Sequence, residues 1–156
     1  MPATAPISAG GLARRPRAAT GRRIAGGEMA SGFGELRRAL DADAFDVVQP
    51  DVVLALGISG ARTLGELALR SNRWFTPHTW TNGIGLLANL HVVCGVGGGP
   101  FVEFPYDPPG WTPDRRDFML AEPVTIDRDG MLVIPDRPGL GIVLDDAAVA
   151  AREVSW

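Results

Sequence analysis

The sequence predicts an α/β fold built from parallel strand–helix units. Short β-rich runs alternate with segments whose apolar residues recur at helical spacing, and turns rich in glycine or proline separate them. This alternation is typical of parallel βα units, because a helix must return the chain before the next parallel strand begins. Of the 156 residues, 46% are hydrophobic and 21% are charged, which is the composition of a globular protein.

The alternation extends from residue 22 to residue 105. A short segment at 22–27 ends in two glycines before Glu28, and Ser59 is placed to cap the second helix. Thr81-Asn82-Gly83 precedes the third helix, and a glycine-rich stretch ends it. The later strands are expected at 45–48, 74–76 and 101–104, and the helices at 33–40, 59–70 and 84–93.

Residues 106–156 have a different pattern, without the strand–helix alternation. The proline-rich stretch 106–118 is expected to be an irregular loop. Residues 124–134 predict a hairpin with Asp129-Gly130 in its turn, and Asp145 or Asp146 is expected to cap a short final helix. We therefore divide the chain into a basic arm or remnant helix at 1–21, four βα-type units at 22–105 and a tail at 106–156.

The net charge of −3 conceals an asymmetry along the chain. Residues 1–27 carry five arginines and no acid, whereas the remainder carries ten arginines and eighteen acids. A basic arm can contact nucleic acid, a membrane surface or an import receptor. No aromatic interleaving or nucleic-acid-binding module accompanies it, and no apolar run reaches the roughly 18 residues of a membrane span. The sequence therefore favours neither nucleic acid nor a membrane as a partner.

Lysine and cysteine usage limits the available chemistry. All 15 basic residues are arginine, which excludes a lysine base or Schiff base within this chain. The single Cys94 excludes an internal disulfide and a multi-thiolate metal site, and we expect it to be a buried small hydrophobe. His91 is expected to pack on its helix rather than bind a metal, because it has no partner at ligand spacing. This usage is compatible with the cytoplasmic location that we expect.

Four polar residues stand at the ends of four successive expected strands: Glu28, Asp51, His78 and Glu103. They are 23, 27 and 25 residues apart, which is about the length of one βα unit. In a barrel of parallel strands such positions meet at the C-terminal rim, where catalytic groups lie. Turn chemistry alone could explain Glu28 or Asp51, so the spacing by itself supports a shared site and separate turn residues about equally.

Each of the four residues has a candidate role. Asp51 and His78 could pair, because a carboxylate fixes the tautomer of an imidazole and makes it a better base. Glu28 could approach an ion after its two glycines, although a lone carboxylate is a poor Mg²⁺ site. Glu103 lies between two apolar residues, and desolvation there would favour a protonated carboxyl that donates a hydrogen bond.

Two further residues follow the histidine and are candidates for lining a substrate pocket. These are Trp80 and Asn82. Asn82 is explained equally well as the N-cap of the helix that begins near Gly83.

Five motifs give the chain a family resemblance. They are GGE at 26–28, QPD at 49–51, FTPHTW at 75–80, FVEFP at 101–105 and PDRPGLG at 135–141. In this order and spacing they resemble the C-terminal half of the enolase superfamily, in its mandelate racemase/muconate lactonizing group. The resemblance extends from about Arg22 to the C-terminus, with an altered stretch at 56–60. It implies the C-terminal part of a (β/α)₇β TIM-like barrel, with the tail returning toward a capping region.

The resemblance also implies the chemistry. Glu28 would be the third ligand of a catalytic Mg²⁺, His78 the general base and Asp51 its dyad partner, while Glu103 would hydrogen-bond the enediolate. Family enzymes remove the proton α to a substrate carboxylate and go on to racemisation, acid-sugar dehydration or lactone cycloisomerisation. A sugar acid is the favoured substrate, and dehydration is the favoured outcome because one dyad with no visible opposing base suits elimination.

The resemblance leaves part of the family's site unmatched. The first two metal carboxylates and a lysine-bearing strand belong upstream of Glu28, where this sequence has 27 residues without an acid or a lysine. We therefore expect an incomplete barrel and an incomplete Mg²⁺ site, inactive in isolation and either marginally stable or self-associating. The alternatives are a racemase or cycloisomerase of the same family, a non-catalytic truncated remnant, or a subunit that pairs with a complementing N-terminal half.

Overall fold

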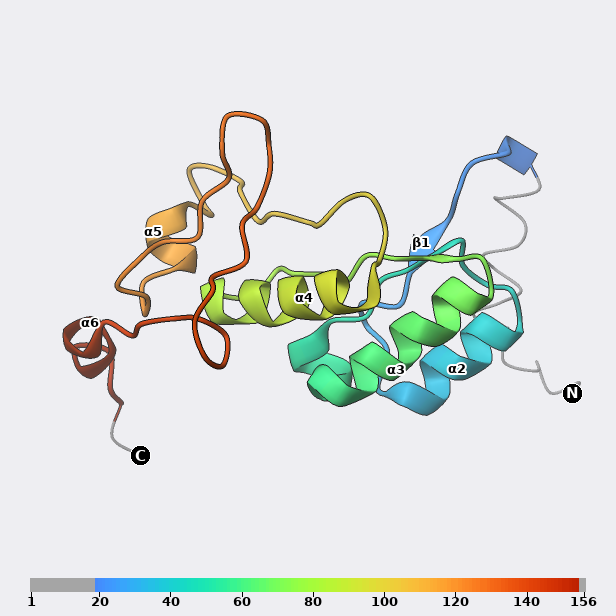
Figure 1. Cartoon of the computed structure of the whole chain (residues 1–156), viewed down its shortest axis with the longest axis horizontal. Coiled ribbons are helices and arrows are strands. Elements are labelled where there is room, and N and C mark those ends of the chain that lie inside the picture. The colour runs from blue at the N-terminus through green and yellow to red at the C-terminus, as the bar shows by residue number, and fades with distance from the viewer. Residues whose placement is uncertain (1–18, 155–156) are drawn as a thin grey trace, which may run out of the picture.

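The computed structural model describes residues 19–154 and contains a three-stranded parallel sheet (Figure 1). Its strands are β1 (Ala25–Gly26), β2 (Val47–Val48) and β3 (Trp74–Phe75), and they lie side by side in sequence order. The register pairs Ala25 with Val47 and Val47 with Trp74. The expected parallel strand–helix alternation is therefore confirmed for three strands, each shorter than the β-rich run that predicts it. Most of the basic arm at 1–21 lies outside the described residues.

Three helices follow the strands and pack on one another, as Figure 1 shows. They are α2 (Phe33–Asp41), α3 (Gly57–Arg70) and α4 (Gly83–Val96). The main apolar core joins helix to sheet through Leu36 of α2, Leu64 of α3 and Val92 of α4, together with Val48 and Phe75 of the strands. This core holds the carboxyl ends of the strands at fixed positions.

Helix α4 is buried nearly all round because it serves two cores. One side contributes to the core described above, while Leu86, Leu87 and Leu90 pack against Leu120 and Val124 of the tail. A helix that is apolar on every face must be covered on every face. The tail provides this cover beside the amino end of α4 (Figure 1).

The ends of α4 agree with the local signals in the sequence. Asn82 accepts a hydrogen bond from the Gly85 N–H at 3.0 Å, and the helix ends at Gly97 in the left-handed conformation with φ 70°. Glycine adopts this conformation without the steric cost of a Cβ atom.

Two expectations at the other elements are wrong. The second helix does not begin at Ser59, because α3 begins at Gly57 directly after a π-helical turn at Val52–Leu56. Asp51 caps the π-helical turn. Residues 101–104 form no strand, although they were expected to be the fourth. There the Thr79 hydroxyl donates to the Glu103 carbonyl oxygen at 2.6 Å, so a side chain makes a contact that a strand would make through its backbone.

The tail is irregular with two short helices, α5 (Pro113–Arg116) and α6 (Asp146–Ala150). Asp145 caps α6 by accepting from the Ala148 N–H at 2.9 Å, as expected. The hairpin reduces to a single antiparallel bridge between Ile126 and Leu132 around a turn with Gly130 at φ 77°. Helix α5 interrupts the stretch that was expected to be irregular throughout.

One expectation about exposure is corrected, and one helical stretch has the length of a membrane span. Cys94 is exposed on α4 rather than buried, and burial of its thiol in part still raises its pKa above the ordinary value. The continuous helical stretch Val52–Arg70 has the length and apolar composition of a membrane span, with a mean hydropathy of 1.5. Its Leu64 lies in the core, and length and composition alone do not place the stretch in a membrane.

Candidate functional site

The carboxyl ends of the three strands bring Glu28, Asp51 and His78 together. His78 Nδ1 lies 3.2 Å from Asp51 Oδ2, and His78 Nε2 lies 3.7 Å from Glu28 Oε2. Glu103 joins them through Thr79 and Trp80, the two residues that follow the histidine. The four residues at successive strand ends in the sequence thus gather at one place in the fold.

Asp51 is fully buried, with 0% of its surface exposed. Its Oδ1 atom accepts hydrogen bonds from the Val53 N–H at 2.8 Å and the Leu54 N–H at 3.2 Å, which leaves Oδ2 for His78. A carboxylate at the amino end of a helix is stabilised by the orphan N–H groups and the helix dipole. These contacts hold Asp51 in one orientation without using the oxygen that faces His78.

Asn89 also holds the start of the π-helical turn at Val52–Leu56. Its Oδ1 atom accepts from the Val52 N–H and its Nδ2 atom donates to the Gly85 carbonyl oxygen, both at 3.0 Å, and the side chain is fully buried. A buried backbone N–H without a partner is costly, so Asn89 satisfies a group that α4 would otherwise cover. The sequence signal for this role is an amide in an otherwise apolar helix.

His78 is held at both its backbone and its ring. Its N–H donates to the Pro50 carbonyl oxygen at 3.2 Å, and 18% of its side chain is exposed. Because Asp51 Oδ2 is an acceptor, hydrogen bonding assigns the proton to Nδ1 and the lone pair to Nε2. The Nε2 atom faces Glu28, whose carboxylate is half-exposed. The arrangement leaves the unprotonated Nε2 directed at Glu28.

Glu103 accepts hydrogen bonds at both carboxylate oxygens. Oε2 accepts from the Thr79 N–H at 2.7 Å, and Oε1 accepts from the Trp80 Nε1–H at 3.0 Å. The donor role expected for this carboxyl stays a prediction.

Of the two candidate pocket residues, Trp80 lies beside Glu103, whereas Asn82 is engaged as the cap of α4. The ring of Trp80 also packs on Trp111 of the tail at a centroid distance of 6.3 Å.

A buried charge pair fixes the segment after Glu103. Arg116 and Asp117 form two hydrogen bonds of 2.7 and 2.6 Å, and the Arg116 guanidinium donates to the carbonyl oxygens of Pro105 and Val124. The guanidinium also lies 4.2 Å above the Phe104 ring. Such a fully satisfied buried pair orders its surroundings, and its removal on one side leaves an uncompensated charge. No local sequence pattern predicts this pair.

The described residues do not by themselves fit a magnesium ion. Among residues 19–154 no group of three or more His, Cys, Asp and Glu side chains could hold a metal. Mg²⁺ requires near-octahedral oxygen coordination, and Glu28 contributes one carboxylate.

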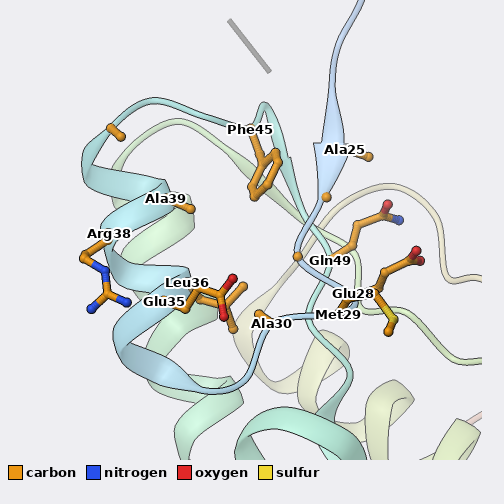
Figure 2. Close-up of a pocket in the computed structure, with 13 residues that line it drawn as sticks. Ala25, Glu28, Met29, Ala30, Glu35, Leu36, Arg38, Ala39, Phe45 and Gln49 are labelled. Atoms are coloured by element: carbon orange, nitrogen blue, oxygen red, sulfur yellow. The ribbon is translucent and has the colours of Figure 1, made fainter. Parts of the chain in front are cut away.

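A cavity of about 710 Å³ lies between β1 and α2, and Glu28 is the residue of the site that lines it. Figure 2 shows Glu35 and Leu36 pointing from α2 into it, whereas Glu28 and Gln49 point away on its far side. The cavity therefore shares Glu28 with the strand-end cluster but contains neither Asp51 nor His78.

Comparison with known proteins agrees with this architecture. The family model described as enolase C-terminal domain-like matches residues 5–148. Arabinonate dehydratase from Saccharolobus solfataricus is 37% identical over 123 residues, covering 79% of this chain and 31% of the relative. D-galactarolactone cycloisomerase from Agrobacterium fabrum is 32% identical over 131 residues, covering 81% and 34%.

Solved structures show the same likeness. A mandelate racemase/muconate lactonizing enzyme from Jannaschia sp. CCS1 aligns with a TM-score of 0.76 and 28% identity, covering 97% of this chain and 37% of that one. The chain thus spans about a third of the length of the curated relatives it matches.

Proposed function

The chain belongs to the enolase C-terminal domain-like family of the enolase superfamily, an enzyme family, and on this basis we propose that it supplies the proton-transfer residues of an acid-sugar dehydratase. The observation that carries the proposal is the contact of 3.2 Å between Asp51 Oδ2 and His78 Nδ1, with Asp51 fully buried. A carboxylate in this position fixes the imidazole tautomer and stabilises the imidazolium that forms when Nε2 takes a proton.

The chemistry follows from these positions. His78 Nε2 removes the proton α to the carboxylate of a sugar acid, and the electron pair of the broken C–H bond forms an enediolate. The β-hydroxyl then leaves as water, taking the proton that His78 received, and the remaining enol becomes a keto acid. Glu103 contacts the enediolate from the adjoining segment, where Thr79 and Trp80 hold it. In this scheme one base serves both proton transfers.

The Mg²⁺ of the family enters the proposal only through Glu28. This carboxylate would be one ligand of an ion whose other ligands come from outside residues 19–154, since those residues hold no complete metal set. A complementing N-terminal half is the partner that such a site requires. The proposal also includes a cytoplasmic location and the division of the chain into segments 1–21, 22–105 and 106–156. Trp80 borders the substrate side of Glu103, and Asn82 shapes the adjoining turn.

The relatives support dehydration and also supply the second candidate. Arabinonate dehydratase and D-galactarolactone cycloisomerase match nearly the same share of this chain, so a cycloisomerase with the same dyad is the alternative. Dehydration is favoured because a single imidazole can both remove the α-proton and protonate the departing hydroxyl. The other alternative is that the chain is a truncated remnant with no catalytic role.

A pair of chimeras tests the function. In the first, this chain replaces the matching 123-residue segment of arabinonate dehydratase, and in the second the matching 131 residues of D-galactarolactone cycloisomerase. Formation of a 2-keto-3-deoxy acid from arabinonate is measured in the first, and lactone isomerisation in the second. His78→Asn in each chimera is the matched control.

We expect keto-acid formation in the first chimera and its loss in the His78→Asn form. Isomerisation in the second chimera alone would favour the cycloisomerase. Chimeras that melt cooperatively but show neither reaction would contradict a catalytic role for these residues and favour the remnant.

A further inference from the structure

The tripeptide His78-Thr79-Trp80 connects the proposed base, His78, to the Glu103 carboxylate. His78 carries the nitrogen that is proposed to take the proton, and the next two residues donate hydrogen bonds to Glu103. Since the His78 N–H is itself bonded to the Pro50 carbonyl oxygen, the tripeptide is attached to the segment that ends in Asp51. Its geometry therefore fixes how far apart the imidazole and the Glu103 carboxylate lie.

Thr79 and Trp80 each donate to a different oxygen of the Glu103 carboxylate. The Thr79 N–H holds Oε2 at 2.7 Å, and the Thr79 hydroxyl donates to the Glu103 carbonyl oxygen at 2.6 Å, with Thr79 fully buried. The Trp80 indole N–H holds Oε1 at 3.0 Å. Two donors on different oxygens prevent rotation of the carboxylate about its terminal bond, which one donor would not.

Trp80 differs from Thr79 in how it is held. Its side chain is 43% exposed, and its ring packs on Trp111 at 6.3 Å with the planes tilted by 41°. Trp111 belongs to the tail, where its N–H donates to the Asp107 carbonyl oxygen at 2.7 Å and its carbonyl oxygen accepts from the Asp107 N–H at 2.8 Å. The indole that contacts Glu103 is thus positioned by a loop from outside the strand–helix units.

We propose that Trp80 is a positioning residue, whose indole N–H orients the Glu103 carboxylate toward the substrate while Trp111 keeps the indole in place. This inference rests on the proposed function for the part that Glu103 plays in the reaction. It replaces the view of Trp80 as a simple wall of the pocket, since the polar edge of the ring faces Glu103.

The test uses the chain with ¹⁵N-labelled tryptophan and follows the indole N–H signals by NMR as the pH is lowered through the range in which carboxylates protonate. The variants are Glu103→Gln, Glu103→Ala and two matched Trp-to-Phe changes, at Trp80 and at Trp111. The Trp111→Phe change removes an indole N–H that has no hydrogen-bond partner among the described residues, so it makes the ring smaller without deleting a hydrogen bond.

We expect the signal that Trp80→Phe removes to move with pH. Glu103→Gln should abolish this movement, because an amide does not protonate in this range. Glu103→Ala should speed exchange of that indole proton with solvent about tenfold. Trp111→Phe should keep the pH response but speed exchange of the Trp80 indole proton, because the smaller ring packs less against the indole.

A Trp80 signal that ignores both pH and the Glu103 changes would overturn the proposal. The Raman band that reports indole hydrogen bonding gives the same comparison if the chain self-associates. Neither readout depends on turnover, so failure of the positioning role is distinct from failure of the proposed function.

Discussion

Replacing Asp51 with asparagine tests the dyad with the smallest change of shape. The asparagine oxygen can take over the cap on Val53 and Leu54, and its NH₂ group then faces His78 Nδ1 at the position of Oδ2. Two donors cannot share that contact, so Nδ1 must become the acceptor and the proton must move to Nε2. The lone pair that takes the substrate proton is then lost, although the fold is kept.

The magnitude follows from the contact that is removed. A hydrogen bond to a charged group contributes about 1.5–3 kcal/mol, which corresponds to roughly 10- to 150-fold in rate. The wrong tautomer adds to this, and where a carboxylate fixes a catalytic imidazole elsewhere, the Asp-to-Asn change lowers turnover about 10⁴-fold. We therefore expect α-proton removal by the arabinonate dehydratase chimera to fall by about 10³- to 10⁴-fold.

The tautomer itself can be measured in the chain. With ¹⁵N-labelled histidine, NMR should show His78 protonated at Nδ1 in the parent and at Nε2 in Asp51→Asn, while His91, which contacts the Leu140 carbonyl oxygen, serves as the internal control. An unchanged His78 tautomer, or a loss of exchange in the chimera below tenfold, would refute this account of the dyad.

Three further predictions concern stability and reactivity. Asn89→Leu leaves the Val52 N–H buried without its partner, so the free energy of unfolding in urea should fall by about 1–3 kcal/mol, and an unchanged midpoint would contradict the role of Asn89. Hydrogen bonds from the Ser31 N–H and hydroxyl lower the pKa of Glu35, so the stability they contribute is present above the unfolded-state pKa and lost as the pH falls through the folded-state pKa. The urea unfolding midpoint should fall less between neutral and acid pH in Glu35→Gln than in the parent chain, and an equal fall in both would refute this. The raised pKa of the Cys94 thiol predicts slower alkylation at neutral pH than free cysteine shows, despite its exposure, and a faster rate would contradict it.

Local signals predicted the elements whose causes are local. The caps at Asn82 and Asp145 and the glycine end of α4 each depend on a few neighbouring residues, and all three are confirmed. The start of α3 was predicted wrongly because it depends on Asp51 and on Asn89, which lies 37 residues beyond the Val52 N–H that it accepts from.

The candidate site likewise contains residues that the sequence predicted and residues whose partners are distant in the sequence and were not predicted. The spacing of one βα unit found the four residues that gather at the site, because three of them follow parallel strands that repeat the same geometry. The groups that hold them, such as Thr79 and Arg116, were not found because their partners come from segments whose approach no periodicity encodes. The absence of a strand at 101–104 has the same origin, since side chains make the contacts there.

The central claim is that His78 takes the proton α to a substrate carboxylate. The most direct test is proton NMR of arabinonate in D₂O with the arabinonate dehydratase chimera and its His78→Asn form. The account predicts that the α-proton signal disappears with the chimera and persists with His78→Asn, while both proteins melt alike. Equal exchange by the two proteins would show that another group removes the proton and would contradict the account.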